Sequence, residues 1–364
     1  MDPSAYTPPY DHALCAALAR AGASVELVTS RFAYARAPMP DGYARRELFY
    51  RLAPGAPGSA LRRAGKLIEH VPDMLRYRRL AHLRTDVVHF QWLDLQWLDW
   101  RLLPNRPTIL TAHDLLPREP RPGQSRAQRR LYSEVSAIVV HSGYGRGQLV
   151  ERLGVAPDKV HVIPHGAFTH LSERRPERPL PSELRAVEGP VVLFFGLLRP
   201  YKGLETLLEA WRGVEGAELW IVGRPRMPLE PLRALAPRGV RFIPRFVSDD
   251  ELPAYFRRAG VVVLPYSRTE RFDWSGVLAT ALAFGKPLVL SDIGGFAEVA
   301  ATGGARLVAP DDPAALREAL AELVDDETAL ARLGEAALAA ALGPYSWDLA
   351  AQKTLALYES VRKG

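Results

Sequence analysis

Two cations follow a strongly apolar run in the stretch FFGLLRPYKG at residues 194–203. Residues 191–195 are continuously apolar, as in a buried strand, and Arg199 and Lys202 come within the next few residues. Fixed positive charges at the end of a strand would stabilise a diphosphate group, above all one that leaves with growing negative charge. On spacing alone, a solvated turn with ordinary surface charges is the alternative.

A second candidate anion site is the helix that starts within the stretch SRTERFDWSGV, residues 267–277. A helix N-terminus presents N–H groups and a positive partial charge, and so binds phosphate. Ser275, Gly276 and Val277 would supply these amides, and the glycine would let an anion approach the backbone closely. Together with the two cations, these amides predict a diphosphate site that requires no metal ion.

Two further predicted strands end in polar or glycine-rich sequence. HDLLP follows one of them with His113 and Asp114, and IGGFAEV follows another with Gly294 and Gly295. In open α/β sheets, ligands bind beyond the carboxyl ends of the strands, so these are candidate site residues. For His113 the alternative is a strand-end histidine that hydrogen-bonds a backbone carbonyl.

The chain lacks the signature motifs of several enzyme classes. The sequence has no GxGxxG after a strand, no GxxxxGK[ST], no GxSxG and no HExxH. These absences argue against nicotinamide or flavin enzymes, P-loop NTPases, serine hydrolases and zinc proteases. Histidines do not cluster at metal-ligand spacing, and Cys15 stands alone, so neither a disulfide within the chain nor a cysteine-based metal site is expected. We expect no metal and no bound cofactor.

The formal net charge is +6 and the isoelectric point is about 9.4. An excess of positive charge favours acidic partners such as nucleotides, phosphates or anionic lipid surfaces. An arginine-rich surface without such a partner would give the same net charge. Aromatic and basic residues do not form a known nucleic-acid module, so no nucleic-acid partner is expected. No apolar run is long enough to span a bilayer and no signal peptide opens the chain, so we expect a cytoplasmic protein.

Short apolar runs alternate with longer amphipathic ones along the whole chain. The expected strands are 24–30, 86–92, 108–114, 137–142 and 159–166 in the first half, and 191–196, 218–223, 240–246, 261–266, 287–292 and 305–310 in the second. This alternation predicts an α/β fold with two doubly wound domains, each with a parallel sheet covered on both faces.

A polar, proline-rich stretch at 172–190 separates the two halves. We therefore expect domains at 1–172 and 173–344, followed by a final amphipathic helix at 345–364. Residues 1–12 have the character of the loop that follows the first strand of such a domain, so that strand is expected to be missing.

These stretches resemble a known family. FFGLLRPYKGLETLLEAW, WIVG, RFVSDDELPAYFRRAGVVVLPY and SGVLATALAFGKPLVLSDIGG follow one another as in the family 4 glycosyltransferases, which have the GT-B fold. YTPPYDHALCAALARAGASVELVTS, TAHDLLP, AIVVHS and VHVIPHG are similar to the first half of the same family. The resemblance implies two Rossmann-like domains facing across a cleft, with the C-terminal helix crossing back to the first domain. It also implies a metal-independent, retaining sugar transfer.

The resemblance further implies substrates and residue roles. The donor would be a UDP- or GDP-sugar, and the acceptor a glycan or lipid-linked molecule in cell-surface polysaccharide or glycolipid synthesis. Lys202 would contact the donor diphosphate with Arg199 nearby, and His113 would approach the donor sugar and the reacting centre. The backbone of Ser275, Gly276 and Val277 would hold the phosphates, and Arg245 and Phe246 would line the nucleobase. The acceptor side would comprise Tyr6, Pro9, Asp114, Gly294 and Gly295.

The sequence departs from the family pattern at its paired glutamates. Thr280 stands where a glutamate normally binds the ribose, and it would offer a hydroxyl but no charge. The partner glutamate falls at Phe272, so Asp273 or Glu270 would bind sugar hydroxyls instead. These exchanges keep two alternatives open: a sugar-nucleotide epimerase of the same fold, and a non-catalytic nucleotide-sugar-binding scaffold.

Arginines, a lysine and leucines interleave at helical spacing over residues 61–84. A basic amphipathic helix can lie on an anionic membrane surface, which would hold the protein peripherally at the inner membrane face. The alternative is a solvated helix whose leucines enter the core, since Pro72 would interrupt a continuous helix. The aromatic stretch 91–104 contains Trp92, Trp97 and Trp100, which either stack on a sugar or lipid headgroup or pack beneath a loop.

Overall fold

The computed structural model describes residues 1–117, 121–174 and 178–363, and the chain divides into two compact units. Unit 1 comprises Met1–Gly166, Arg271–Asp273 and the C-terminal segment from Trp347; unit 2 comprises Ala167–Glu270 and Trp274–Ser346. Unit 2 begins before the expected boundary at 172–173, because Ala167 N and Phe168 N donate to the carbonyls of Tyr345 and Ala279. Residues 175–177 of the expected linker, and residue 364 of the expected last helix, lie outside the described residues.

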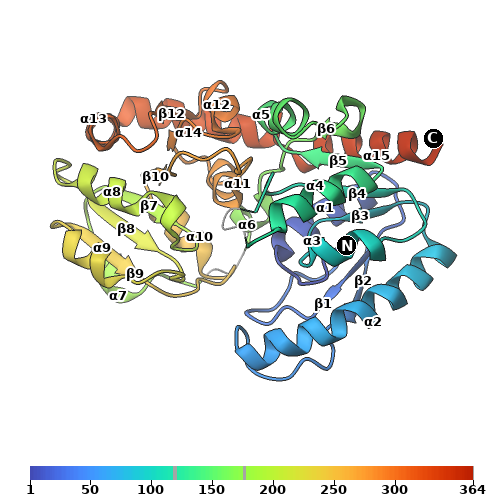
Figure 1. Ribbon diagram of the computed structural model, residues 1–364. Helices are drawn as coiled ribbons and strands as arrows, with labels where there is room; N and C mark the ends of the chain where they lie inside the picture. The colour runs from blue at the N-terminus through green and yellow to red at the C-terminus, as the bar shows by residue number, and fades with distance from the viewer. Residues whose placement is uncertain (118–120, 175–177, 364) are drawn as a thin grey trace. The chain divides into compact units, whose positions relative to one another are not determined.

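The strands of unit 1 are β1 (Glu26–Ser30), β2 (Ala44–Phe49), β3 (Val88–Phe90), β4 (Thr108–Thr111), β5 (Ala137–Val140) and β6 (Val160–Val162). Its helices are α1 (Pro8–Arg20), α2 (Ala60–Arg84), α3 (Gln96–Leu102), α4 (Gln124–Glu134), α5 (Gly143–Gly147) and α15 (Trp347–Lys363) (Figure 1). A π-helical turn at Gln148–Arg152 continues α5, and a 3₁₀ turn at Pro157–Lys159 precedes β6.

The strands of unit 1 form two parallel sheets, with the orders β1-β2 and β3-β4-β5-β6. The first two residues of the chain bridge them: Asp2 N donates to Val28 O (3.2 Å), and Gln91 N donates to Met1 O (2.8 Å). Asp2 and Met1 therefore pair with the backbone of β1 and of Gln91, which follows β3, at edges of the two sheets.

The long helix α2 is continuous from Ala60 to Arg84, so the expected interruption at Pro72 is wrong. Its buried side chains are His70, Met74, Tyr77 and Ala81. The alternative, in which its leucines enter the core, is also wrong for most of them. The exposed apolar side chains are Leu61 (60%), Leu67 (56%), Ile68 (76%), Leu75 (43%) and Leu83 (76%).

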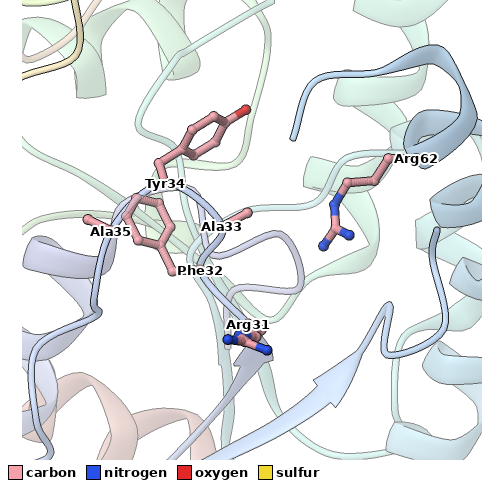
Figure 2. A pocket seen from close by; sticks show the side chains of 6 residues that line it. All are labelled: Arg31, Phe32, Ala33, Tyr34, Ala35 and Arg62. Carbon is pink, nitrogen blue, oxygen red and sulfur yellow. The ribbon is translucent and has the colours of Figure 1, made fainter. Parts of the chain in front are cut away.

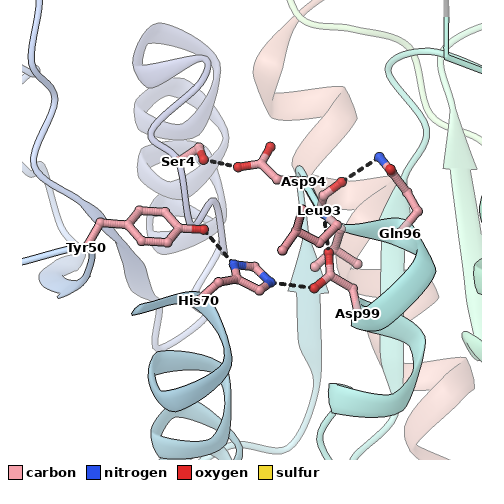
Figure 3. A network of polar contacts seen from close by, with 8 residues as sticks. Ser4, Tyr50, His70, Leu93, Asp94, Gln96 and Asp99 are labelled. Carbon is pink, nitrogen blue, oxygen red and sulfur yellow. Dashed lines mark hydrogen bonds and ion pairs between the residues drawn. The ribbon is translucent and has the colours of Figure 1, made fainter. Parts of the chain in front are cut away.

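A buried polar network fixes α2 against its neighbours (Figure 3). The His70 ring lies 2.7 Å from Tyr50 Oη through Nδ1 and 2.6 Å from Asp99 Oδ1 through Nε2. Asp99 also accepts a hydrogen bond from the Leu95 backbone N–H at 2.8 Å. Because buried polar groups are costly to leave unpaired, this network specifies one orientation of α2 relative to α3.

The strands of unit 2 are β7 (Val191–Phe195), β8 (Glu218–Val222), β9 (Val240–Ile243), β10 (Val261–Leu264), β11 (Leu288–Ser291) and β12 (Ala305–Val308). Its helices are α6 (Thr169–Ser172), α7 (Ser182–Arg185), α8 (Leu204–Trp211), α9 (Glu230–Leu235), α10 (Leu252–Arg258), α11 (Gly276–Ala283), α12 (Phe296–Ala300), α13 (Pro313–Val324) and α14 (Glu327–Leu342). All strand pairs are parallel, in the order β12-β11-β10-β7-β8-β9.

Both faces of the unit 2 sheet are buried, as continuous apolar strands predict. Alternate residues such as Phe194 and Ile221 pack with the leucines of α8 and α13 in one core cluster. The intervening residues, such as Leu193 and Trp220, are also fully buried. Every strand expected in this half is confirmed, within a few residues at its ends.

The last helix, α15, belongs to unit 1 although the chain enters it from unit 2, which confirms the expected return to the first domain. It packs on α1, and Arg20 forms an exposed ion pair with Asp348 at 2.9 Å. Within the same unit, Tyr358 Oη lies 2.8 Å from His89 Nδ1.

Candidate functional site

A tight turn places the two cations of unit 2 at the end of the sheet. Gly203 has φ = +67°, and a Cβ atom there would lie 1.7 Å from the carbonyl oxygen of Pro265, after β10. Ser267 N donates to Tyr201 O at 2.9 Å. Only glycine allows this approach, so the turn after β7 lies directly against the turn after β10.

Lys202 is nearly buried, at 6% exposure, and its ammonium group contacts Tyr266. Nζ donates a hydrogen bond to the phenol oxygen and lies 3.9 Å from the centroid of the Tyr266 ring. The phenol oxygen is in turn 3.0 Å from Ser275 Oγ, at the start of α11. The side chain of Lys202 is thus held at the N-terminus of a helix, where two sources of positive charge coincide.

The start of α11 has the features of an anion site. Gly276 is exposed, and the first N–H groups of an α-helix have no acceptor within the helix. A Cβ atom on Gly196, at the end of β7, would lie 3.1 Å from a methyl carbon of Val277, so the end of β7 also lies against α11. The structure therefore brings together Lys202, Ser275, Gly276 and Val277, four of the predicted donor-site residues.

Other residues predicted for the donor lie differently. Thr280 donates its hydroxyl proton to Gly276 O at 2.9 Å, which directs the hydroxyl along its own helix. Arg245 pairs with Glu251 at 2.9 Å and donates to Tyr255 Oη at 3.2 Å. Phe246 follows β9 and is 41% exposed. Arg199 is half-buried just before the 3₁₀ turn at Pro200–Lys202.

The two carboxylates expected to bind sugar hydroxyls differ in burial and belong to different units. Glu270 is exposed, at the end of a unit 2 segment. Asp273 is fully buried in unit 1, where its carboxylate accepts hydrogen bonds from His141 N at 2.6 Å and from Ser142 Oγ. A Cβ atom on Gly145 would lie 2.6 Å from Asp273 Oδ1. Asp273 therefore holds the N-terminus of α5, a structural role in place of the expected contact with sugar.

In unit 1, three histidines follow three adjacent strands. His113 follows β4, His141 follows β5 and His165 follows β6. His113 is half-buried, and its ring stacks on Trp92 (4.6 Å between centroids, 13°) and meets the edge of Tyr10 (4.7 Å, 86°). Burial lowers the pKa of His141 to about 4 and holds the pKa of His165 well below its ordinary value.

The residues predicted for the acceptor side divide between the units. Tyr6, Pro9 and Asp114 are in unit 1, whereas Gly294 and Gly295 are in unit 2, between β11 and α12. Tyr6 is 51% exposed, and the centroid of its ring lies 4.4 Å from that of Trp92. Trp92 in turn stacks on His113, so the three rings form one continuous group. The backbone of Asp114 forms an antiparallel bridge with Phe272.

A cavity of about 420 Å³ lies in unit 1 at the carboxyl end of β1 (Figure 2). Residues 31–35, which follow β1, and Arg62, in the first turn of α2, line it. The lining carries two guanidinium groups, from Arg31 and Arg62, and the rings of Phe32 and Tyr34, but none of its residues is acidic. Arg62 Nη1 donates to Ala53 O at 2.9 Å. The cavity suits an anion attached to a flat or ring-shaped group.

Sequence reasoning missed Tyr266, Tyr10 and His141 as parts of these sites. The only signal was position, since His141 directly follows β5 and Tyr266 comes two residues after the end of β10. Among the residues that the structure describes, no helix combines the length and apolar character needed to cross a lipid bilayer.

Comparison with known proteins gives consistent matches. The profile described as Glycosyltransferase Family 4 matches residues 10–171, and the profile Glycosyl transferases group 1 matches residues 189–326. A D-inositol 3-phosphate glycosyltransferase of Xylanimonas cellulosilytica is 30% identical over 393 aligned positions, which cover 96% of this chain and 90% of that protein. An MMP alpha-(1->4)-mannosyltransferase of Mycolicibacterium hassiacum is 31% identical, but the match covers 64% of this chain and only 56% of that relative.

Among solved structures, Anabaena HepE in complex with UDP and glucose has a TM-score of 0.75 at 17% identity, covering 99% of this chain and 98% of that one. A likeness at this identity shows the fold, which is GT-B with two Rossmann-like α/β units, as expected from the sequence. The near full-length relative and the two profiles in tandem show that the chain belongs to the family 4 glycosyltransferases.

Proposed function

We propose that the protein is a retaining, metal-independent glycosyltransferase. It moves a sugar from a nucleoside-diphosphate donor to a hydroxyl of a glycan or lipid-linked acceptor, in the synthesis of cell-surface polysaccharide or glycolipid. One observation carries the proposal: in unit 2, Tyr266 holds the Lys202 ammonium at the N-terminus of α11. A buried cation beside free helix amides favours a diphosphate over an uncharged ligand.

The chemistry follows from this charge distribution. The bond between the anomeric carbon and the phosphate oxygen breaks, and negative charge develops on the departing diphosphate. Lys202 and the first amides of α11 stabilise that charge without having to reorganise. The acceptor oxygen forms the new bond to the anomeric carbon on the same face, and its proton passes to the departing phosphate oxygen.

The donor is proposed to be a UDP- or GDP-sugar. HepE, solved with UDP and glucose, supports testing UDP first, and the mannosyltransferase relative supports including mannosyl donors. Phe246 is the proposed stacking surface for the base, and Arg199 a further contact of the phosphates. Because Thr280 directs its hydroxyl to Gly276 O, we expect the ribose to be held without a carboxylate from that position.

On unit 1, His113 is proposed to contact the transferred sugar. The cavity after β1 is proposed to receive an anionic group of the acceptor, since Arg31 and Arg62 face the same space. A volume of about 420 Å³ falls within the range of ordinary small-molecule sites.

Helix α2 is proposed to contact an anionic membrane surface peripherally. Leu61, Ile68 and Leu75 recur every seven residues on its exposed side, opposite the buried His70 and Met74. The exposed arginines of the same helix are Arg63, Arg76, Arg79 and Arg84. Apolar side chains bordered by arginines match the boundary between acyl chains and anionic headgroups.

Calorimetric titration of UDP, GDP and ADP in EDTA tests the donor site. We expect one nucleotide to bind the wild type, and Lys202→Ala to weaken it roughly 10–100-fold, as for loss of a charged hydrogen bond. Arg212→Ala is the control, because it removes an exposed cation from the same unit. Equal affinity of Lys202→Ala and wild type would remove the proposed diphosphate site.

A further inference from the structure

A hydrogen bond joins two of the histidines of unit 1, His113 and His141, and their partners define where their protons lie. His141 is 2% exposed, and its Nδ1 lies 3.0 Å from the carbonyl oxygen of Ile163. A carbonyl oxygen only accepts, so Nδ1 of His141 carries a hydrogen. Burial lowers the pKa of this ring to about 4, so it is neutral near pH 7. Its Nε2 therefore carries a lone pair and no hydrogen.

The proton position on His113 follows from that of His141. His113 Nδ1 lies 3.3 Å from His141 Nε2. Since this Nε2 is an acceptor, Nδ1 of His113 must be the donor. A neutral His113 then carries its only N–H on Nδ1, and its Nε2, which is a buried atom, keeps a lone pair.

The orientation of the His113 ring has a separate cause. Trp92 stacks on one face at 4.6 Å, and Tyr10 meets the ring edge-on at 4.7 Å. These contacts fix the plane of the imidazole but do not distinguish its two nitrogens. The distinction depends on the hydrogen bond to His141.

We propose that His141 is a positioning residue that holds His113 in the Nδ1–H form through the chain Ile163 O, His141, His113. In this form, Nε2 of His113 accepts a hydrogen bond from a sugar hydroxyl, and it cannot donate one. The role of Nε2 as an acceptor from the sugar rests on the proposed function. The Nδ1–H form of His113 is a property of the protein without substrate, so the two claims can fail separately.

Long-range ¹H–¹⁵N spectra of the full chain with ¹⁵N-labelled histidine test the Nδ1–H form of His113 at neutral pH. His113→Gln identifies the His113 signals by their loss. In the wild type we expect the pattern of an Nδ1–H imidazole at His113. An Nε2–H pattern in the wild type would overturn the proposal without any further variant.

Substitutions at His141 test the positioning role. His141→Phe keeps a flat ring but removes the acceptor, so the proton of His113 is free to move to Nε2. His141→Gln keeps an oxygen that accepts from Nδ1–H and should preserve the wild-type pattern. His161→Phe, the same change at a half-buried histidine of β6, is the control. An unchanged His113 pattern in a folded His141→Phe protein would contradict the role.

Kinetics connect the tautomer to turnover. We expect His141→Phe to lower kcat roughly 10-fold or more, as when a functional histidine loses the group that orients it, with nucleotide affinity unchanged. His141→Gln should recover most of this loss. If the tautomer changes in His141→Phe but kcat does not, the acceptor role of Nε2 is wrong while the proton assignment stands. Loss of nucleotide binding in Lys202→Ala tests the donor site independently.

Discussion

The ammonium nitrogen of Lys202 lies 3.9 Å from the centroid of the Tyr266 ring and donates a hydrogen bond to its phenol oxygen. Tyr266 is fully buried, so this contact is not a solvent-screened surface pair. Because β7 and β10 are neighbours in the sheet, the residues that follow them meet at the same edge. Lys202 therefore lies beside the start of α11, where the proposed diphosphate site requires a cation.

Removing the phenol oxygen of Tyr266 tests the position of the Lys202 ammonium without removing its positive charge. We expect Tyr266→Phe to weaken nucleoside-diphosphate binding roughly 3–10-fold, as for loss of one ordinary hydrogen bond, and therefore less than Lys202→Ala does. Calorimetry in EDTA measures both variants. Tyr345→Phe, the same change at another buried tyrosine of unit 2, should bind as the wild type does. An effect of Tyr266→Phe equal to that of Tyr345→Phe would mean that the phenol does not position Lys202.

The cavity after β1 should bind small phosphates through its two arginines. We expect glycerol 3-phosphate to shift the backbone amide signals of Ala33 and Ala35 in ¹H–¹⁵N spectra. Arg31→Gln and Arg62→Gln should each weaken this binding roughly 10-fold, as for loss of one charged contact. Arg63→Gln changes an exposed arginine of the same helix that does not line the cavity, and serves as the control. If the amides of the wild type do not respond, the acceptor site lies elsewhere.

Helix α2 should bring the protein to anionic vesicles at low salt. In flotation assays we expect binding to phosphatidylglycerol vesicles and weaker binding to phosphatidylcholine, and we expect added salt to reduce it. Ile68→Glu should abolish most of the binding, because it places a charge within the exposed apolar stripe. Leu342→Glu changes an exposed leucine of α14 and should leave flotation unchanged. Equal recovery with both lipids would exclude an electrostatic contribution from the arginines.

The glycine that lets the two turns meet should be irreplaceable. Gly203→Ala introduces a Cβ atom 1.7 Å from Pro265 O at a positive φ, whereas Gly216→Ala introduces one at φ = +73° with no heavy atom within 4 Å. We expect Gly216→Ala to lower the free energy of unfolding by about 1–2 kcal/mol, and Gly203→Ala by more than about 3 kcal/mol. Denaturant unfolding measures both. Similar losses in the two variants would show that the turns can move apart easily.

Local sequence was sufficient for most of the elements. Continuous Val and Leu runs predict the buried strands of unit 2, since a parallel sheet buries both faces of each strand. The same reasoning missed β2, which has the sequence ARRELF. Its first four residues include three charged ones and are not buried, and only its last two residues are buried. Sequence reasoning also left two interpretations of α2 open, because a count of leucines does not show which side of a helix faces the core.

The sequence by itself determined the family, the two α/β units and the position of Arg199 and Lys202 after a strand. Only the tertiary structure decided which partners those positions have. Tyr266 is 64 residues from Lys202 in sequence, and Asp273 is 131 residues from the Ser142 hydroxyl that it accepts from. The order of the strands in the unit 2 sheet brings Tyr266 to Lys202, and the return of Arg271–Asp273 to unit 1 brings Asp273 to Ser142. The local pattern of a single strand predicts neither the strand order nor this return. The sequence therefore predicted a cation after β7 and a helix start at Ser275, but not the Tyr266 phenol that lies between them.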